Sequence, residues 1–131
     1  MSEEEKKLTT KEIGDQGEVM ALQLLVGKGY AIEGRNVRIG HLEMDILCRH
    51  GNRLVAVEVK SRRADHLDED YGLNKEKIRH LAQAASAYVK SRNLPHEVQI
   101  DAILITNYPD GRPPMVEHLE DIALPPRKRR R

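Results

Sequence analysis

The sequence predicts an α/β protein with a mixed β-sheet flanked by helices, in the element order α-β-β-β-α-β-β. Segments whose apolar residues recur at helical spacing alternate with segments that show the two-residue alternation of strands. A helix separates the third strand from the fourth, and such a connection allows these two strands to lie parallel. At 131 residues the chain fits one domain. We expect this domain at residues 9–124, after a flexible N-terminal segment at 1–8 and before a basic tail at 125–131.

The first helix is predicted at residues 9–26, where a capping-box pattern precedes apolar residues at helical intervals. Gly14 and Gly17 each cost about 1 kcal/mol inside a helix relative to alanine. Close approach of a strand or of a nucleic-acid backbone is the expected reason for both. The first strand follows at residues 30–38, and Gly34 within it indicates a bulge or a bend.

Residues 43–63 are typical of a β-hairpin whose two-residue turn is Gly51-Asn52. Counting outward from this turn predicts which side chains face each other across the two strands. The charged side chains then share one face of the hairpin, with Asp45 opposite Glu58 and Glu43 opposite Lys60. The other face is apolar and sets the register by burial. It holds Met44, Ile46, Cys48, Val55, Val57 and Val59.

Asp45 and Glu58 are like charges, which destabilise a facing pair unless a cation, a shared proton or solvent intervenes. Mg²⁺ takes oxygen ligands, so Asp45, Glu58 and the Val59 carbonyl suit it, with Mn²⁺ as an alternative. Lys60 projects from the same side, where an ammonium group could hold a metal-bound water and offset phosphate charge. The other interpretation is an exposed charged face, in which Glu43 and Lys60 form a surface pair worth less than about 1 kcal/mol.

The second helix is predicted to follow Asn74, which can cap its N-terminus. Its apolar stripe consists of Ile78, Leu81, Ala82, Ala85, Tyr88 and Val89. Residues 98–106 form a strongly apolar strand, within which we expect Asp101 to be a structural hydrogen-bonding group. A proline-rich turn then leads to a last strand at residues 115–119.

Composition narrows the classes of function only slightly. The net charge is +1, from 22 basic and 21 acidic residues, so any nucleic-acid partner has to be recognised by local patches. Cys48 is the only cysteine, which excludes an internal disulfide and indicates a core residue. The N-terminal residues lack the apolar region of a secretory signal, and no apolar run is long enough to span a bilayer. We therefore expect a cytoplasmic protein without a membrane partner.

The order of Asp45 and then Glu58-Val59-Lys60 on the next strand resembles the PD-(D/E)xK signature of restriction-endonuclease-like nucleases, although Met44 stands where the signature has proline. Seven separated motifs, spread over roughly residues 11–122, also resemble in order the YraN-like family of small bacterial proteins. They are Gly14-x-x-Gly17-Glu18-x-x-Ala21, Gly29-Tyr30, Arg35-Asn36-Val37-Arg38, Glu43-Met44-Asp45, Val57-Glu58-Val59-Lys60-Ser61-Arg62, Lys77 and Ile100-Asp101-Ala102.

This resemblance implies a restriction-endonuclease-like core and, by analogy with archaeal Holliday junction resolvases, metal-dependent cleavage of DNA that is branched or otherwise structured. It also implies a homodimer, because two strands need two sites. In this hypothesis Asp45 and Glu58 bind Mg²⁺, Glu18 of the first helix assists them, and Lys60 positions the attacking water. The expected phosphate contacts are Arg62, Arg63, Lys77 and Arg79.

Simpler interpretations stay open for several of these residues. Glu18 and Lys77 are also compatible with ordinary solvated positions on their helices. The alternative function is a non-catalytic nucleic-acid-binding protein that keeps the nuclease-like fold. Such a protein would bind in a strongly salt-dependent manner without cutting.

Overall fold

The computed structural model describes the backbone of residues 10–65 and 72–123, with side chains from residue 15 onward. The predicted N-terminal segment at 1–8 and the predicted basic tail at 125–131 lie outside the described residues. Neither helix in the described part of the chain is long and apolar enough to cross a bilayer.

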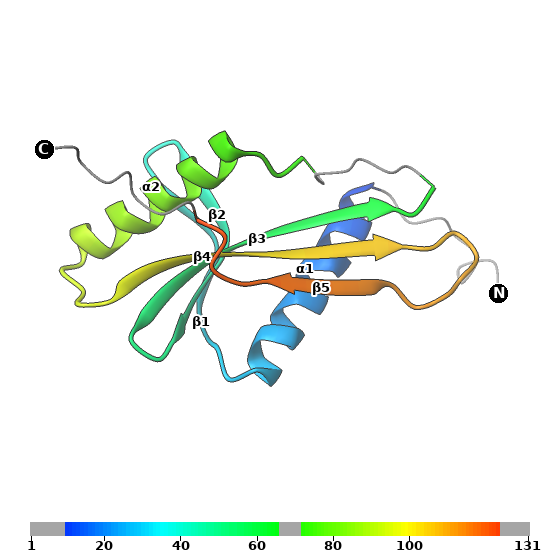
Figure 1. The fold of residues 1–131 in the computed structure, drawn as a ribbon, viewed down its shortest axis with the longest axis horizontal. Coiled ribbons are helices and arrows are strands. Elements are labelled where there is room, and N and C mark those ends of the chain that lie inside the picture. The colour runs from blue at the N-terminus through cyan, green and yellow to red at the C-terminus, as the bar shows by residue number, and fades with distance from the viewer. Residues whose placement is uncertain (1–9, 66–71, 124–131) are drawn as a thin grey trace, which may run out of the picture.

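The helices and strands follow one another in the predicted order (Figure 1). They are α1 (Thr10–Gly27), β1 (Ala31–Ile39), β2 (Leu42–His50), β3 (Arg53–Arg63), α2 (Lys75–Ser91), β4 (Glu97–Asn107) and β5 (Met115–Leu119). The strands form one sheet in the order β1-β2-β3-β4-β5. The β3 and β4 strands are parallel and the other neighbours are antiparallel, which confirms the predicted mixed sheet. The arrangement is consistent with a nuclease-like core.

The two helices cover opposite faces of the sheet, so the middle strands are buried on both sides (Figure 1). On one face, Ala21 and Leu25 of α1 pack with Ile46, Cys48, Val55, Val57, Ile103 and Ile105. On the other face, Leu81, Ala84, Ala85 and Tyr88 of α2 pack with Met44, Leu47, Leu54, Ala56 and Ile100. The prediction of a single apolar face on the β2–β3 hairpin is therefore wrong, since α2 buries the second face as well.

The prediction that Met44 shares a face with Ile46 is also wrong, because the side-chain alternation of β2 breaks between them. Met44 packs against the α2 cluster, whereas Ile46 packs against the α1 cluster. The β1–β2 register pairs Arg35 with Ile46 and Val37 with Met44, and it skips Asn36. Asn36 has a φ of 50°, which is outside the extended region. The break in the alternation of β2 therefore falls at Asp45, which lies opposite Asn36.

The structure confirms the predictions made for Gly34 and Gly17. The register of β1 against β2 shifts between Ile32 and Gly34, which confirms the predicted bulge. A Cβ atom at Gly17 would lie 2.6 Å from the Ser61 Oγ atom, so any larger residue at this position of α1 would require the Ser61 side chain to shift. The expected approach of a strand is thus confirmed for Gly17, while the side-chain surroundings of Gly14 lie outside the described residues.

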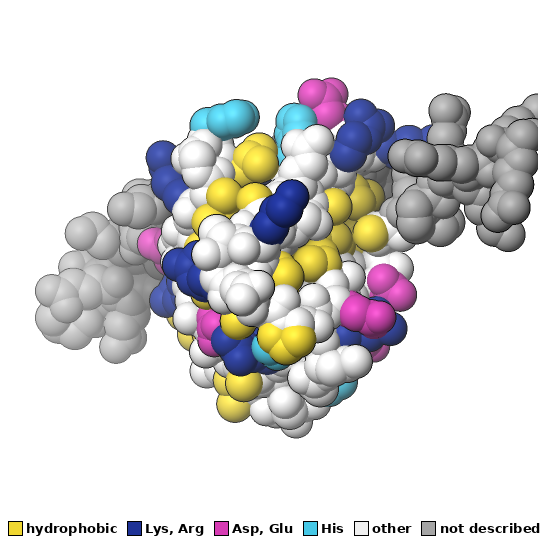
Figure 2. All heavy atoms as spheres, turned by 90° about the vertical axis from the view of Figure 1, so that its left-hand side faces the viewer, with side chains coloured by type: hydrophobic (Ala, Val, Ile, Leu, Met, Phe, Trp, Pro, Cys, Tyr) yellow, Lys and Arg dark blue, Asp and Glu magenta, His cyan; other side chains and the backbone are white. Residues whose placement is uncertain are grey.

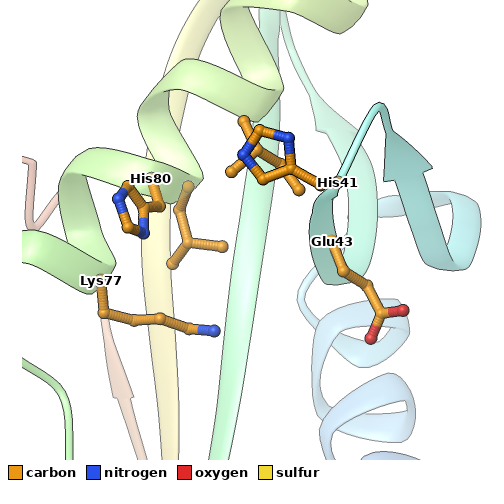
Figure 3. A pocket seen from close by; sticks show the side chains of 6 residues that line it. His41, Glu43, Lys77 and His80 are labelled. Atoms are coloured by element: carbon orange, nitrogen blue, oxygen red, sulfur yellow. The ribbon is translucent and has the colours of Figure 1, made fainter.

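The α2 helix begins as its sequence predicted. Asn74 Oδ1 accepts a hydrogen bond from the backbone N–H of Lys77 at 2.9 Å, which caps the helix. The buried side of α2 consists of Leu81, Ala84, Ala85 and Tyr88, in agreement with the predicted stripe. Lys77 and His80 extend from the first turns of this capped helix, α2 (Figure 3).

Candidate functional site

Asp45 lies close to Glu58 just beyond the end of the β2–β3 ladder. The β2–β3 ladder runs from His50 opposite Arg53 to Ile46 opposite Val57, as counted from the turn. At the open end of this ladder the Val59 N–H donates to Asp45 Oδ2 at 2.9 Å, so a side chain replaces the backbone partner. Because N–H and C=O of one strand residue point toward the same neighbour, the Val59 carbonyl also faces the Asp45 side.

Glu58 is buried at this point, with only 2% of its surface exposed. Its Oε2 atom lies 3.3 Å from the Lys60 ammonium and 3.5 Å from the Lys77 ammonium. Its Oε1 atom is buried and has no hydrogen-bond donor within the part of the chain that the structure describes. An unpartnered buried carboxylate oxygen is rare in a folded protein because the lost hydration is not replaced.

The pKa of Glu58 is raised above its ordinary value, chiefly because burial removes water and then because the Asp45 charge lies close by. The ammonium groups of Lys77 and Lys60 oppose this rise. The site therefore disfavours the ionised form of Glu58 next to Asp45, even with two lysines present. A further cation would stabilise that ionised form. Burial of Glu58 also excludes, for this residue, the interpretation of an ordinary exposed hairpin face.

Among the predicted phosphate contacts, Lys77 has a role that sequence reasoning missed, since it pairs with Glu58 across the space between α2 and β3. Arg63 forms a forked pair with Asp65, at 3.1 and 2.9 Å. Arg62 lies two residues after Lys60 on β3. Residues two apart on a strand share a face, so Arg62 belongs to the α2 face of the sheet. Arg79 is exposed on α2.

Glu18 lies on α1, the helix that covers the face opposite to Glu58. Its side chain is paired with Arg35 of β1 at 3.3 Å. The assisting role of Glu18 at the metal therefore stays a prediction. Glu43, which the hairpin count placed opposite Lys60, instead pairs with Arg38 of the neighbouring strand at 3.0 Å.

A pocket of about 250 Å³ adjoins this centre between the β1–β2 turn and the first turns of α2. It is lined by His41, Leu42, Glu43, Lys77, His80 and Leu81. Lys77 belongs to both features, since the same side chain lines the pocket and reaches Glu58. In Figure 3 the rings of His41 and His80 and the Lys77 chain gather around the pocket, while the Glu43 carboxylate points away from them.

A second polar cluster lies on the α1 face, around the fully buried Asp101. Asp101 Oδ2 accepts from the Tyr30 hydroxyl at 3.3 Å and lies 2.7 Å from His118 Nε2. Its Oδ1 accepts from the Gln99 amide at 2.9 Å and from the Asp121 N–H at 3.0 Å. These contacts agree with the structural hydrogen-bonding role expected for Asp101.

Asp101, His118 and Glu120 offer ligand atoms that all lie within 4.8 Å of one another, so this group could hold a metal ion. Its atoms also bond to their neighbours: Lys28 Nζ lies 2.7 Å from His118 Nδ1, and the Tyr30 hydroxyl donates to Glu120 at 2.9 Å. A metal ion would have to displace these contacts. Sequence reasoning missed His118 and Glu120, for which the only signal was their two-residue spacing at the last strand.

Residues 17–105 match the family described as "Uncharacterised protein family UPF0102". The chain belongs to the UPF0102 family. A UPF0102 protein of Phocaeicola vulgatus is 32% identical over 116 residues, which cover 88% of this chain and 94% of that protein. A UPF0102 protein of Dichelobacter nodosus is 37% identical over 105 residues, which cover 79% of this chain and 83% of that protein.

Membership in UPF0102 confirms the resemblance to small bacterial YraN-like proteins. The part of the chain that matches UPF0102 contains Asp45, Glu58, Lys60 and Lys77, and it ends before His118 and Glu120.

Proposed function

We propose that this UPF0102 protein is a metal-dependent phosphodiesterase that cuts DNA, with Asp45, Glu58 and Lys60 as its catalytic residues. The observation that supports this function best is the Glu58 carboxylate, which is buried beside a second carboxylate with one oxygen unpartnered. A carboxylate in this state is a poor structural element, because its desolvation is not compensated. It is, however, a suitable ligand for a cation that arrives with the substrate.

The donor set fits a hard divalent cation. Asp45 and Glu58 supply carboxylate oxygens, the Val59 carbonyl faces the same side, and neither sulfur nor nitrogen ligands are involved. Mg²⁺ is the expected ion, and Mn²⁺ suits the same oxygens. When bound, such an ion polarises the phosphoryl oxygens and lowers the pKa of a bound water.

The protein side chains supply the remaining functions. Lys60, 3.3 Å from Glu58, is placed to hold the attacking water and to offset charge that develops on the phosphate. Lys77 neutralises Glu58 from the helix side and is free to turn toward a phosphate once a cation takes over that task. The proposed metal site does not depend on Glu18, which lies on the helix of the opposite face and pairs with Arg35.

DNA is proposed as the substrate, with Arg62, Arg63, Lys77 and Arg79 as contacts to the phosphates. The chain has four tyrosines and no phenylalanine or tryptophan, so few side chains could stack on unpaired bases. Recognition of backbone and shape is therefore favoured, and a branched substrate cut by a homodimer follows from the analogy with junction resolvases.

One observation favours a second candidate, a nucleic-acid-binding protein without catalysis. Lys60 and Lys77 both contact Glu58 Oε2, and two ammonium groups can stabilise a buried carboxylate without any metal. In that case the same surface would bind phosphates but would lack the cation needed for cleavage.

Cleavage assays distinguish the two candidates. The wild type and Glu58→Gln are incubated with labelled linear, nicked, flapped and four-way-junction DNA and with duplex RNA, in Mg²⁺, Mn²⁺ or EDTA. Glu97→Gln is the matched control, since Glu97 is an exposed acid at the start of the neighbouring strand. We expect metal-dependent products that fall at least about a thousandfold in Glu58→Gln, because several kcal/mol of transition-state stabilisation is lost.

Each other result has a definite meaning. Equal cleavage by the wild type and Glu58→Gln would show that the catalytic site lies elsewhere. Salt-sensitive binding without products in any metal would establish the non-catalytic candidate.

A further inference from the structure

We propose that the pocket beside Lys77 binds the nucleotide next to the scissile phosphate, with His41 and His80 as its phosphate contacts. This inference rests on the proposed function, because it assumes that a phosphodiester backbone passes over Glu58. It assigns a binding role to two histidines that are outside the proposed catalytic centre. It also names the ligand of the pocket as one sugar-phosphate unit of a DNA strand.

The position of the pocket supports this assignment. Lys77 lines the pocket and lies 3.5 Å from Glu58, so the pocket is within reach of the sugar-phosphate unit that adjoins a phosphate at Glu58. Gly40, with a φ of 62°, forms the tight β1–β2 turn that brings His41 to the rim opposite α2. The two walls thus come from different elements and enclose the space on the same face of the sheet as Glu58.

The chemistry of the lining fits a nucleotide better than an apolar ligand. Lys77, His41 and His80 all offer N–H donors, and the only carboxylate that lines the pocket, on Glu43, points away and pairs with Arg38 (Figure 3). His80 has just a distant contact with Glu76, at 3.9 Å, so its ring is available for a ligand. An anionic group is therefore favoured at this position.

The size and the apolar lining point to a single sugar-phosphate unit. The volume of about 250 Å³ is below the range of pockets that enclose drug-sized ligands. Leu42 and Leu81 supply apolar surface that suits the carbon face of a deoxyribose, and Leu81 is 1% exposed and therefore fixed in place. The described lining contains no Tyr, Phe or Trp side chain, so contact with the backbone is favoured over stacking on a base.

DNA affinity in EDTA tests the pocket without depending on catalysis. We compare the wild type with the double variant His41→Ala/His80→Ala on a labelled four-way junction and on a labelled duplex at low salt. Lys90→Ala and Gln83→Ala are the controls, since both residues are exposed on the same helix and do not line the pocket. We expect at least about a tenfold weaker Kd for the double variant and less than a twofold change for either control.

Replacing one phosphate at a time by an uncharged methylphosphonate makes the test specific to one contact. The wild type should lose affinity at a position next to the cut or bound phosphate, and the double variant should show no further loss at that position. Losses that add independently at every position would overturn the proposal. Thermal unfolding of each variant confirms that the protein is folded, as expected for two exposed side chains.

The outcome is separate from that of the proposed function. An unchanged Kd for the double variant overturns the pocket site, whether or not the wild type cuts DNA. If the wild type does not cut DNA but the double variant shows the expected loss of affinity, the phosphodiesterase activity is excluded and the nucleotide-binding role of the pocket is supported.

Discussion

Two buried carboxylates on adjacent strands of this sheet have opposite surroundings. Asp101 of β4 and Glu58 of β3 lie on opposite faces, and both are nearly inaccessible to solvent. Asp101 has donors on both oxygens, with contacts from a tyrosine, a histidine, an amide side chain and a backbone N–H. Glu58 has two lysines near one oxygen, whereas its other oxygen has no donor among the described residues.

The number of hydrogen-bond donors around a buried carboxylate distinguishes an acid with a structural role from one that is expected to bind a ligand. The hydrogen bonds of Asp101 join the α1–β1 connection, β4 and β5, so this acid stabilises the position of the edge strand. Glu58 lacks such compensation, and its pKa is raised by burial and by Asp45. An acid that costs stability in the free protein is the one expected to gain a partner on binding.

The largest expected effect is the loss of stability on removing Asp101. Asp101→Ala leaves the His118 ring, the Gln99 side-chain amide and the Asp121 N–H without this acceptor. We expect the free energy of unfolding to fall by about 3 to 5 kcal/mol, measured by urea denaturation. The matched control is Asp110→Ala in the exposed β4–β5 turn, which should leave the urea midpoint almost unchanged.

If Asp101→Ala were as stable as the control, the contrast between a structural acid and a ligand would no longer hold.

Metal titration gives the next largest effect and decides between the two clusters. If Asp45 and Glu58 bind Mg²⁺ or Mn²⁺, a hundredfold excess over Kd stabilises the wild type by about 2.7 kcal/mol. Glu58→Gln should lose this stabilisation, and His118→Ala should keep it. The change in Tm with metal concentration, recorded by calorimetry, measures both variants.

The opposite pattern, with stabilisation lost in His118→Ala alone, would place the ion among Asp101, His118 and Glu120.

The smallest effect concerns pH. The folded-state pKa of Glu58 is raised above its ordinary value near 4.5, so the ionised form is less favourable in the folded protein than in the unfolded chain. The contribution of Glu58 to stability is thus fully present below pH 4.5 and is lost as pH rises through the raised pKa. Glu58→Gln should therefore match the wild type near pH 4 and exceed it at pH 7, by about 4 °C in Tm for each kcal/mol recovered.

Denaturation curves from pH 4 to pH 8 measure this difference. A wild type that gains stability over Glu58→Gln as pH rises would mean that Lys60 and Lys77 outweigh the cost of burial.

Cys48 illustrates a prediction that needed little structure. As the single cysteine, alternating with apolar residues on β2, it was expected in the core, and it is fully buried. Burial and the nearby Asp101 raise the pKa of its thiol to about 12, so it is an unreactive thiol at physiological pH.

The described Lys and Arg side chains on the face drawn in Figure 2 are scattered among hydrophobic and acidic ones, as the near-neutral composition suggested. Local clustering of charge, such as that of Lys60 and Lys77 around Glu58, therefore had to come from the fold.

By itself the sequence determined the order of helices and strands, the β2–β3 register as far as Ile46 and Val57, and the proximity of Asp45 to Glu58. These features depend on local rules: helical and two-residue periodicity, the Gly51-Asn52 turn and the Asn74 cap act over a few residues. Only the tertiary structure decided which face each helix covers, and therefore that Glu58 is buried.

It also decided the contact of Lys77 with Glu58, and the network that joins Tyr30 to Asp101 across 71 positions of the chain. Such contacts depend on how α1, α2 and β5 dock onto the sheet. Docking is set by the packing of many side chains at once, and short-range patterns carry no information about it.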